Sequence, residues 1–138
     1  MEVIALRGAM NTGKSLTINI VYNFLLSGPW IQVPGFFRIL GNPKYNDVFD
    51  ILIKDDSKLG ILGMGDYQRT SNSLASLLKE QETNDCDIVI CACRANLNIE
   101  KAVSHYANHV FVDKTIAVDL SNYLAVNQMD ADKIIRLI

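Results

Sequence analysis

A run of eight residues near the beginning of the chain limits the available folds more than any other part of the sequence. An apolar stretch at residues 3–6 precedes it and indicates a β-strand, and an amphipathic stretch at residues 15–26 follows it and indicates a helix. The run therefore predicts a tight loop that joins the end of a strand to the start of a helix. Its residues are Gly8, Ala9, Met10, Asn11, Thr12, Gly13, Lys14 and Ser15.

A loop of this kind suits a ligand with several negative charges. Gly8 and Gly13 lack a Cβ, so the backbone can turn sharply and approach phosphate oxygens closely, and Asn11 tolerates a positive φ better than most residues. The backbone N–H groups of the loop and of the first helical turn then point at the anion, and the helix dipole favours negative charge there. We expect the Lys14 ammonium to contact the β- and γ-phosphates and the Ser15 hydroxyl to bind Mg²⁺.

At these eight positions the chain resembles the P-loop NTPase superfamily, whose Walker A motif has the same Gly-x-x-x-x-Gly-Lys-Ser pattern. The resemblance implies binding of a nucleoside triphosphate with Mg²⁺ through residues 8–15. It says little about the use that is made of the nucleotide.

Apolar runs and amphipathic stretches alternate along the rest of the chain. This alternation predicts an α/β fold in three layers, in which a mostly parallel sheet has helices on both faces, as in P-loop NTPases. The turn residues at 55–58 predict one antiparallel hairpin, with an edge strand, between residues 48–53 and 59–64. A length of 138 residues predicts a single domain, 1–138, and the resemblance implies that this domain binds a nucleotide. Further strands are predicted at 87–93, 110–112 and 133–138, the last with a helix as alternative, and helices at 72–81, 99–106 and 120–128.

Two further polar residues follow predicted strands. Asp66 follows the second strand of the hairpin, where a P-loop protein has its Walker B carboxylate, so we expect it to hold Mg²⁺ directly or through water. Arg94 ends a central strand and is the best candidate for phosphate contact among Arg38, Arg69 and Arg94. We therefore predict Ser15 and Asp66 as metal ligands and Lys14 and Arg94 as catalytic residues. The alternatives are a turn residue for Asp66 and a surface ion pair for Arg94.

Residues 29–46 are harder to interpret. They contain all three prolines of the chain, two glycines and four aromatic residues, and predict a long irregular connection with one short element at most. Long loops are often functional. This segment either contributes to a substrate or switch site or covers the core as an aromatic flap.

The residues around the motif favour ATP over GTP. A Ras-like GTPase needs a threonine before the hairpin, a D-x-x-G after it and an N-K-x-D for guanine, and all three are missing. The order of elements after residue 59 is loosely similar to the additional-strand ATPases, although Tyr67 stands where their catalytic glutamate would follow Asp66. We expect a Mg²⁺-dependent NTPase. A small-molecule or nucleotide kinase and a binding module without hydrolysis are the alternatives.

Composition and charge limit the kinds of partner that the chain can have. The net charge is −2 and the 13 Lys and Arg residues are scattered, so no basic patch indicates nucleic acid or an anionic membrane. No apolar stretch has the length of a membrane span, and no signal-peptide pattern begins the chain, so we expect a cytoplasmic protein. The three cysteines form neither a disulfide framework nor a zinc pattern. The sequence leaves open whether the chain binds a protein partner or forms a homo-oligomer.

Overall fold

The computed structural model describes residues 1–68 and 70–138. Within this part of the chain it is an α/β protein with a sheet of seven strands and four α-helices. The strands are β1 (Glu2–Gly8), β2 (Ile31–Gln32), β3 (Arg38–Leu40), β4 (Asp47–Lys54), β5 (Ser57–Leu62), β6 (Ile88–Arg94) and β7 (His109–Asp113). The α-helices are α1 (Lys14–Ser27), α2 (Leu74–Thr83), α3 (Leu97–Ser104) and α4 (Tyr123–Ile135), with short 3-10 helices η1 (Pro43–Tyr45) and η2 (Leu120–Asn122).

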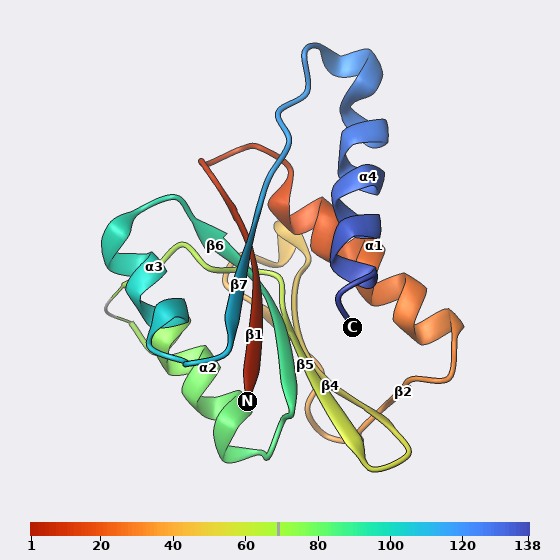
Figure 1. Ribbon diagram of the computed structural model, residues 1–138, viewed down its shortest axis with the longest axis vertical. Helices are drawn as coiled ribbons and strands as arrows, with labels where there is room; N and C mark the ends of the chain where they lie inside the picture. The colour runs from red at the N-terminus through yellow and green to blue at the C-terminus, as the bar shows by residue number, and fades with distance from the viewer. Residues whose placement is uncertain (69) are drawn as a thin grey trace.

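The strands follow the order β2-β4-β5-β6-β1-β7, and β3 pairs separately with β4. On one side of the sheet, β5, β6, β1 and β7 are parallel to one another. Their carboxyl ends therefore lie at one edge, where Gly8 of β1 is in register with Arg94 of β6. The loop that carries the glycine and lysine pattern leaves β1 at this edge and leads directly into α1 (Figure 1).

The other side of the sheet is antiparallel. The predicted hairpin is present as β4 and β5, but residues 29–46 add β2 and β3 to β4, both antiparallel. The sheet is therefore mixed rather than mostly parallel, and β4 is not an edge strand. The physical reason is that a free edge of β4 would expose unpaired backbone groups, and this segment pairs with them. Its docking buries Leu40 and places the Arg38 guanidinium 3.7 Å from the centroid of the Phe49 ring.

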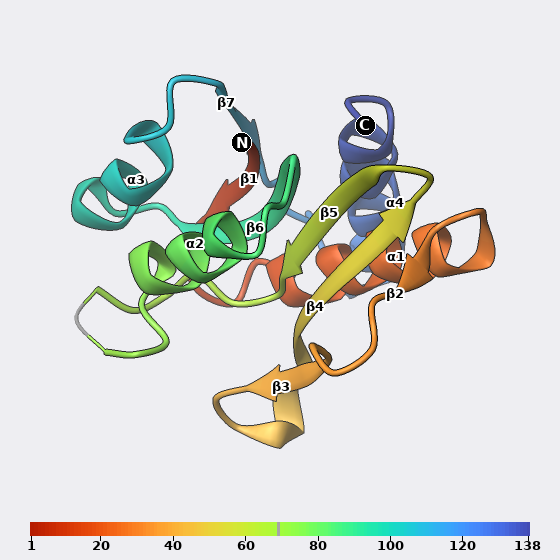
Figure 2. The ribbon, with the colours of Figure 1, turned by 90° about the horizontal axis from the view of Figure 1, so that it is seen from below.

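Alternate residues of the strands face two separate apolar clusters. Val3 and Ala5 of β1 belong to the cluster that contains the buried residues of α2 and α3. Ile4 and Leu6 belong to the cluster that contains those of α1 and α4. Figure 1 shows α2 and α3 on one side of the strands and α1 and α4 on the other, and Figure 2 gives the view from below.

The C-terminal strand predicted at residues 133–138 is not formed, because α4 runs from Tyr123 to Ile135. Its buried residues are Asn127, Asp130, Ala131 and Ile134, and this spacing places them on one helical face. Packing of that face against α1 overrides the β-branched residues at the end of the chain. Among the described residues, no helix is long and apolar enough to cross a membrane.

Candidate functional site

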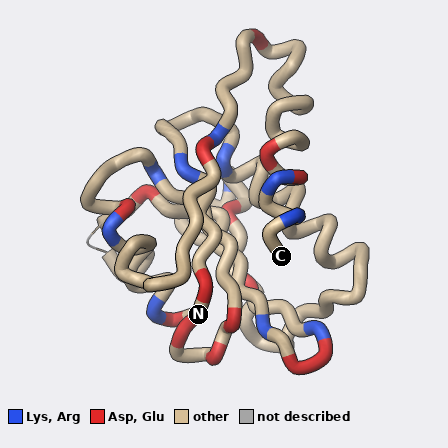
Figure 3. The backbone as a smooth tube through the Cα atoms, in the orientation of Figure 1, with Lys and Arg blue, Asp and Glu red and all other residues tan. Residues whose placement is uncertain are grey.

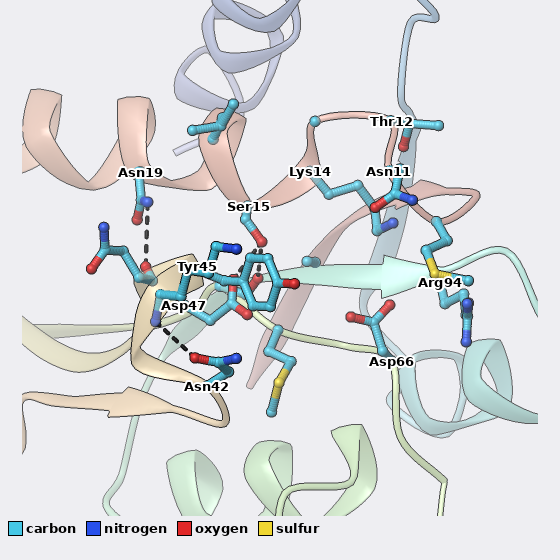
Figure 4. Close-up of a pocket in the computed structure, with 18 of the residues that line it drawn as sticks. Asn11, Thr12, Lys14, Ser15, Asn19, Asn42, Tyr45, Asp47, Asp66 and Arg94 are labelled. Atoms are coloured by element: carbon cyan, nitrogen blue, oxygen red, sulfur yellow. Dashed lines mark hydrogen bonds between the residues drawn. The ribbon is translucent and has the colours of Figure 1, made fainter.

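A pocket of about 590 Å³ lies between the Gly8–Ser15 loop and residues 42–47 (Figure 4). Its position at the carboxyl ends of the parallel strands is typical of ligand sites in α/β sheets. Of the site residues predicted from the sequence, Gly8, the last residue of β1, and Ala9 do not line the pocket. The others all line it: Met10, Asn11, Thr12, Gly13, Lys14, Ser15, Asp66 and Arg94.

The loop holds its shape through two positions of positive φ, at Asn11 (60°) and Gly13 (93°). Gly13 is the N-cap residue of α1, and the helix receives no side-chain cap there. The N–H groups of its first turn therefore stay available to an anion in the pocket. Inside the loop, Thr12 Oγ1 donates to the Ala9 carbonyl at 2.8 Å, which closes the turn.

Lys14 extends its ammonium across the loop, where Nζ donates to the Ala9 carbonyl at 2.7 Å. The residue is 7% exposed, and this burial lowers the pKa of the ammonium, while the nearby Asp66 carboxylate opposes the shift. An ammonium has three donors, so two remain for other acceptors. Lys14 therefore places a buried positive charge across the Gly8–Ser15 loop.

Asp47 is a site residue that sequence reasoning missed. It is the first residue of β4, is 7% exposed, and accepts a hydrogen bond from the Ser15 hydroxyl. Burial raises the pKa of the Asp47 carboxyl, and the hydrogen bond from Ser15 opposes this rise. The available signal was the hairpin itself. Because β4 and β5 are antiparallel, the start of β4 must lie at the edge where β5 ends, beside the predicted site.

Asp66 lies beyond the strand that was expected to carry it, because β5 ends at Leu62. One carboxylate oxygen, Oδ1, is buried and has no hydrogen-bond partner within residues 1–68 and 70–138. The charges of Asp66 and Arg94 both act on the pKa of Lys14, so the three groups lie near one another. Figure 4 shows the Asp66 carboxylate below Lys14 and beside Arg94, with Asp47 on the other side of the pocket beneath Ser15.

The three arginines considered for phosphate contact lie in different places. Arg94 ends β6 and lines the pocket, and its backbone N–H donates to the Gly65 carbonyl at 2.9 Å. Arg38 forms a bidentate ion pair with Glu80 at 2.7 and 3.0 Å and does not line the pocket, so its role is structural. Arg69 lies outside the described residues. Arg94 is thus the arginine that the described structure brings to the pocket.

The oxygen ligands of the pocket suit Mg²⁺. The Ser15 hydroxyl and the carboxylates of Asp47 and Asp66 are hard oxygen donors, which Mg²⁺ prefers. The unpartnered Asp66 oxygen gives the set one acceptor that no described protein group occupies. The residues present therefore fit the metal that the resemblance implies.

A second pocket of about 290 Å³ adjoins the loop and shares Asn11, Thr12 and Tyr123 with the first. Its other walls come from the segment between β7 and α4, where Ile116 is 73% and Leu120 91% exposed. After Lys114, the segment from Thr115 to Asn122 has a single charged residue, Asp119, and Figure 3 shows it almost entirely without charged positions. An apolar surface thus lies next to the Gly8–Ser15 loop.

Comparison of the chain with models of known protein families, with curated proteins and with solved structures gives no significant match. The functional argument therefore depends on the residues of the pocket themselves.

Proposed function

We propose that this protein is a P-loop nucleotide-binding protein that binds a nucleoside triphosphate, ATP in preference to GTP, with Mg²⁺ and hydrolyses it. The observation that carries the proposal is the Gly8–Ser15 loop. It has positive φ at Asn11 and Gly13, leads into a helix start without a side-chain cap, and has the Lys14 ammonium across it. The two pairs of helices that pack on separate clusters of strand residues support a P-loop-like three-layer arrangement.

Each group has a chemical role in this proposal. The backbone N–H groups of the loop and the Lys14 ammonium bind the β- and γ-phosphates. Ser15 would hold Mg²⁺ together with a carboxylate of the pocket, Asp47 or Asp66, and the ion would neutralise phosphate charge. Arg94 adds a positive charge at the same pocket. The nucleobase would bind in the apolar second pocket.

A phosphotransferase is the second candidate, and the extent of the larger pocket favours it. Beyond the loop, the pocket of about 590 Å³ is also lined by Asn42, Lys44 and Tyr45 of the 42–47 segment, which could contact an acceptor other than water. Phosphate release in the absence of any acceptor would favour hydrolysis. A nucleotide-binding module without hydrolysis would bind the triphosphate and leave it intact.

The proposed function is tested by Lys14→Ala. We expect the binding free energy of the triphosphate to weaken by about 1.5–3 kcal/mol, because a charge-assisted contact is lost. Thermal stability should change little. Calorimetric titration of both proteins measures the affinity. Lys101→Ala is the control, since Lys101 is exposed on α3, away from the pocket. Equal affinity of the wild type and Lys14→Ala for the triphosphate would contradict the assignment.

The base preference is a separate prediction. Adenine needs only apolar contact and backbone groups, whereas guanine selectivity needs a carboxylate for the ring N1–H and amine. We therefore expect ATP to bind as tightly as GTP or more tightly in a competition titration. A preference for GTP above tenfold, about 1.4 kcal/mol, would point to Asp119, which lines the second pocket. Asp113 is the weaker candidate, because it is paired with Arg7 at 2.8 Å.

A further inference from the structure

We propose that Asp47 and Asp66 divide the acidic chemistry of the pocket: Asp47 joins Ser15 as the carboxylate ligand of Mg²⁺, and Asp66 accepts the proton of the attacking water. The proposal rests on the proposed nucleotide function. It reassigns the metal carboxylate from Asp66, which the sequence predicts, to a residue on the neighbouring strand.

The first step is the contact of Ser15. Its hydroxyl donates to the Asp47 carboxylate, so these two oxygen ligands already lie together on one side of the pocket. Ligands of one small cation must converge on one point. The hydroxyl that the Walker A pattern assigns to Mg²⁺ is therefore next to Asp47.

The second step concerns Gly63, which directly follows β5 and lies opposite Ser15. Its carbonyl oxygen is 3.4 Å from Ser15 Oγ. A Cβ at Gly63 would lie 2.7 Å from the backbone N of Val48 and 3.0 Å from Cα of Asp47, so no side chain fits there. The β5 chain thus has no room for an acidic side chain opposite Ser15, and β4 supplies one from Asp47.

The third step is the position of Asp66, three residues further along the chain. Its buried Oδ1 has no hydrogen-bond donor among the described residues. A buried acceptor of this kind is costly unless a donor reaches it, and the carboxylate faces the side of the pocket where Lys14 and Arg94 lie (Figure 4). A water molecule held there would be a donor to Asp66 and would lie near the charges that bind the γ-phosphate.

The reaction then balances without a further reactant. The water oxygen forms a bond to the γ-phosphorus, and the bond from that phosphorus to the β,γ-bridging oxygen breaks, with its electron pair on the nucleoside diphosphate. One proton of the water passes to the Asp66 carboxylate and is later released to solvent. The products are the diphosphate and inorganic phosphate. Asp66 would thus do the work of the glutamate that Tyr67 replaces.

The two roles are separated by Asp47→Asn and Asp66→Asn, with Asp56→Asn in the exposed hairpin turn as the matched control. Calorimetry measures the affinity for a non-hydrolysable ATP analogue with and without Mg²⁺, and Mn²⁺ spectroscopy reports on the metal directly. In Asp47→Asn, we expect the factor by which Mg²⁺ raises the affinity for the analogue to be at least tenfold smaller than in the wild type. The affinity measured without Mg²⁺ should stay unchanged. Ser15→Ala removes the other ligand without changing a charge, and should show the same loss if Asp47→Asn does not fold.

In Asp66→Asn, Mg²⁺ should raise the affinity for the analogue as much as in the wild type, and the Mn²⁺ spectroscopic signal should be unchanged. Its kcat for phosphate release should fall about 10²–10⁴-fold, the range of a lost general base, with KM little changed. Loss of the metal effect in Asp66→Asn but not in Asp47→Asn would overturn the proposal in favour of the sequence assignment. Mg²⁺-dependent binding without turnover by the wild type would overturn the role of Asp66. If the wild type binds no triphosphate, the proposed function itself fails.

Discussion

Lys114→Met is expected to lower the free energy of unfolding by about 3–5 kcal/mol, because it removes the closer and fully buried cation of the two that pair with the buried Asp130 carboxylate. Nζ of Lys114 lies 3.0 Å from Asp130 Oδ2, and both side chains are 0% exposed. Asp130 also accepts hydrogen bonds from the backbone N–H and the hydroxyl of Thr115, both at 2.7 Å. The Thr115 donors carry no charge, and the remaining cation, Lys133, is 3.5 Å from Oδ1 with a side chain that is 48% exposed, so it is the weaker partner.

Urea denaturation of the wild type and the variant measures this change. Lys79→Met is the matched control, because Lys79 forms an exposed helical pair with Glu82, its side chain being 72% exposed. We expect a change of about 0–1 kcal/mol there. If the two variants lose the same stability, the Lys114–Asp130 pair is not buried as described.

This ion pair lies directly behind the Gly8–Ser15 loop. A Cβ at Gly8 would be 2.8 Å from Cβ of Lys114, and one at Gly13 would be 2.7 Å from Oδ1 of Asn127. Both ends of the loop therefore rest on the segment from β7 to α4. The Lys114–Asp130 pair fixes that segment, so its loss should also loosen the surface that supports the loop.

The local part of the site could be predicted from the sequence, because its signals lie within a few residues of one another. The strand, the loop and the helix around Gly13 follow from glycine positions and apolar periodicity, and the hairpin follows from its turn residues. Arg94 ends β6 as predicted, since a continuous apolar run defines that strand.

The rest depends on contacts between distant segments. Asn127 and Asp130 are polar yet fully buried, so α4 has no clear apolar stripe, and its end was predicted as a strand. β2 and β3 are two and three residues long and exist only because β4 offers them an edge. The hairpin pattern places the start of β4 at the edge where β5 ends, but the contact of Asp47 with Ser15 also requires the packing of α1 against the sheet, which no local pattern contains.

Gly65→Ala is expected to destabilise the protein by about 3 kcal/mol, at the upper end of the cost of overpacking. A Cβ at Gly65 would lie 1.8 Å from the carbonyl oxygen of Ala92 and 3.0 Å from Cα of Cys93. Both obstacles are backbone atoms of β6, so no side chain can move aside to make room. The chain would have to lift away from β6 and break the 2.9 Å hydrogen bond from Arg94 N to Gly65 O.

Denaturant unfolding compares this variant with Gly28→Ala, whose Cβ would meet nothing closer than the Leu25 carbonyl at 3.6 Å. We expect the control to stay within about 0.5 kcal/mol of the wild type. Gly65 directly precedes Asp66 and bonds to Arg94, so the same contact that makes the substitution costly also places two candidate catalytic residues in the pocket. Equal stability of the two variants would mean that residues 63–66 do not lie closely on β6, and Asp66 would then lose the support that aims it at Lys14.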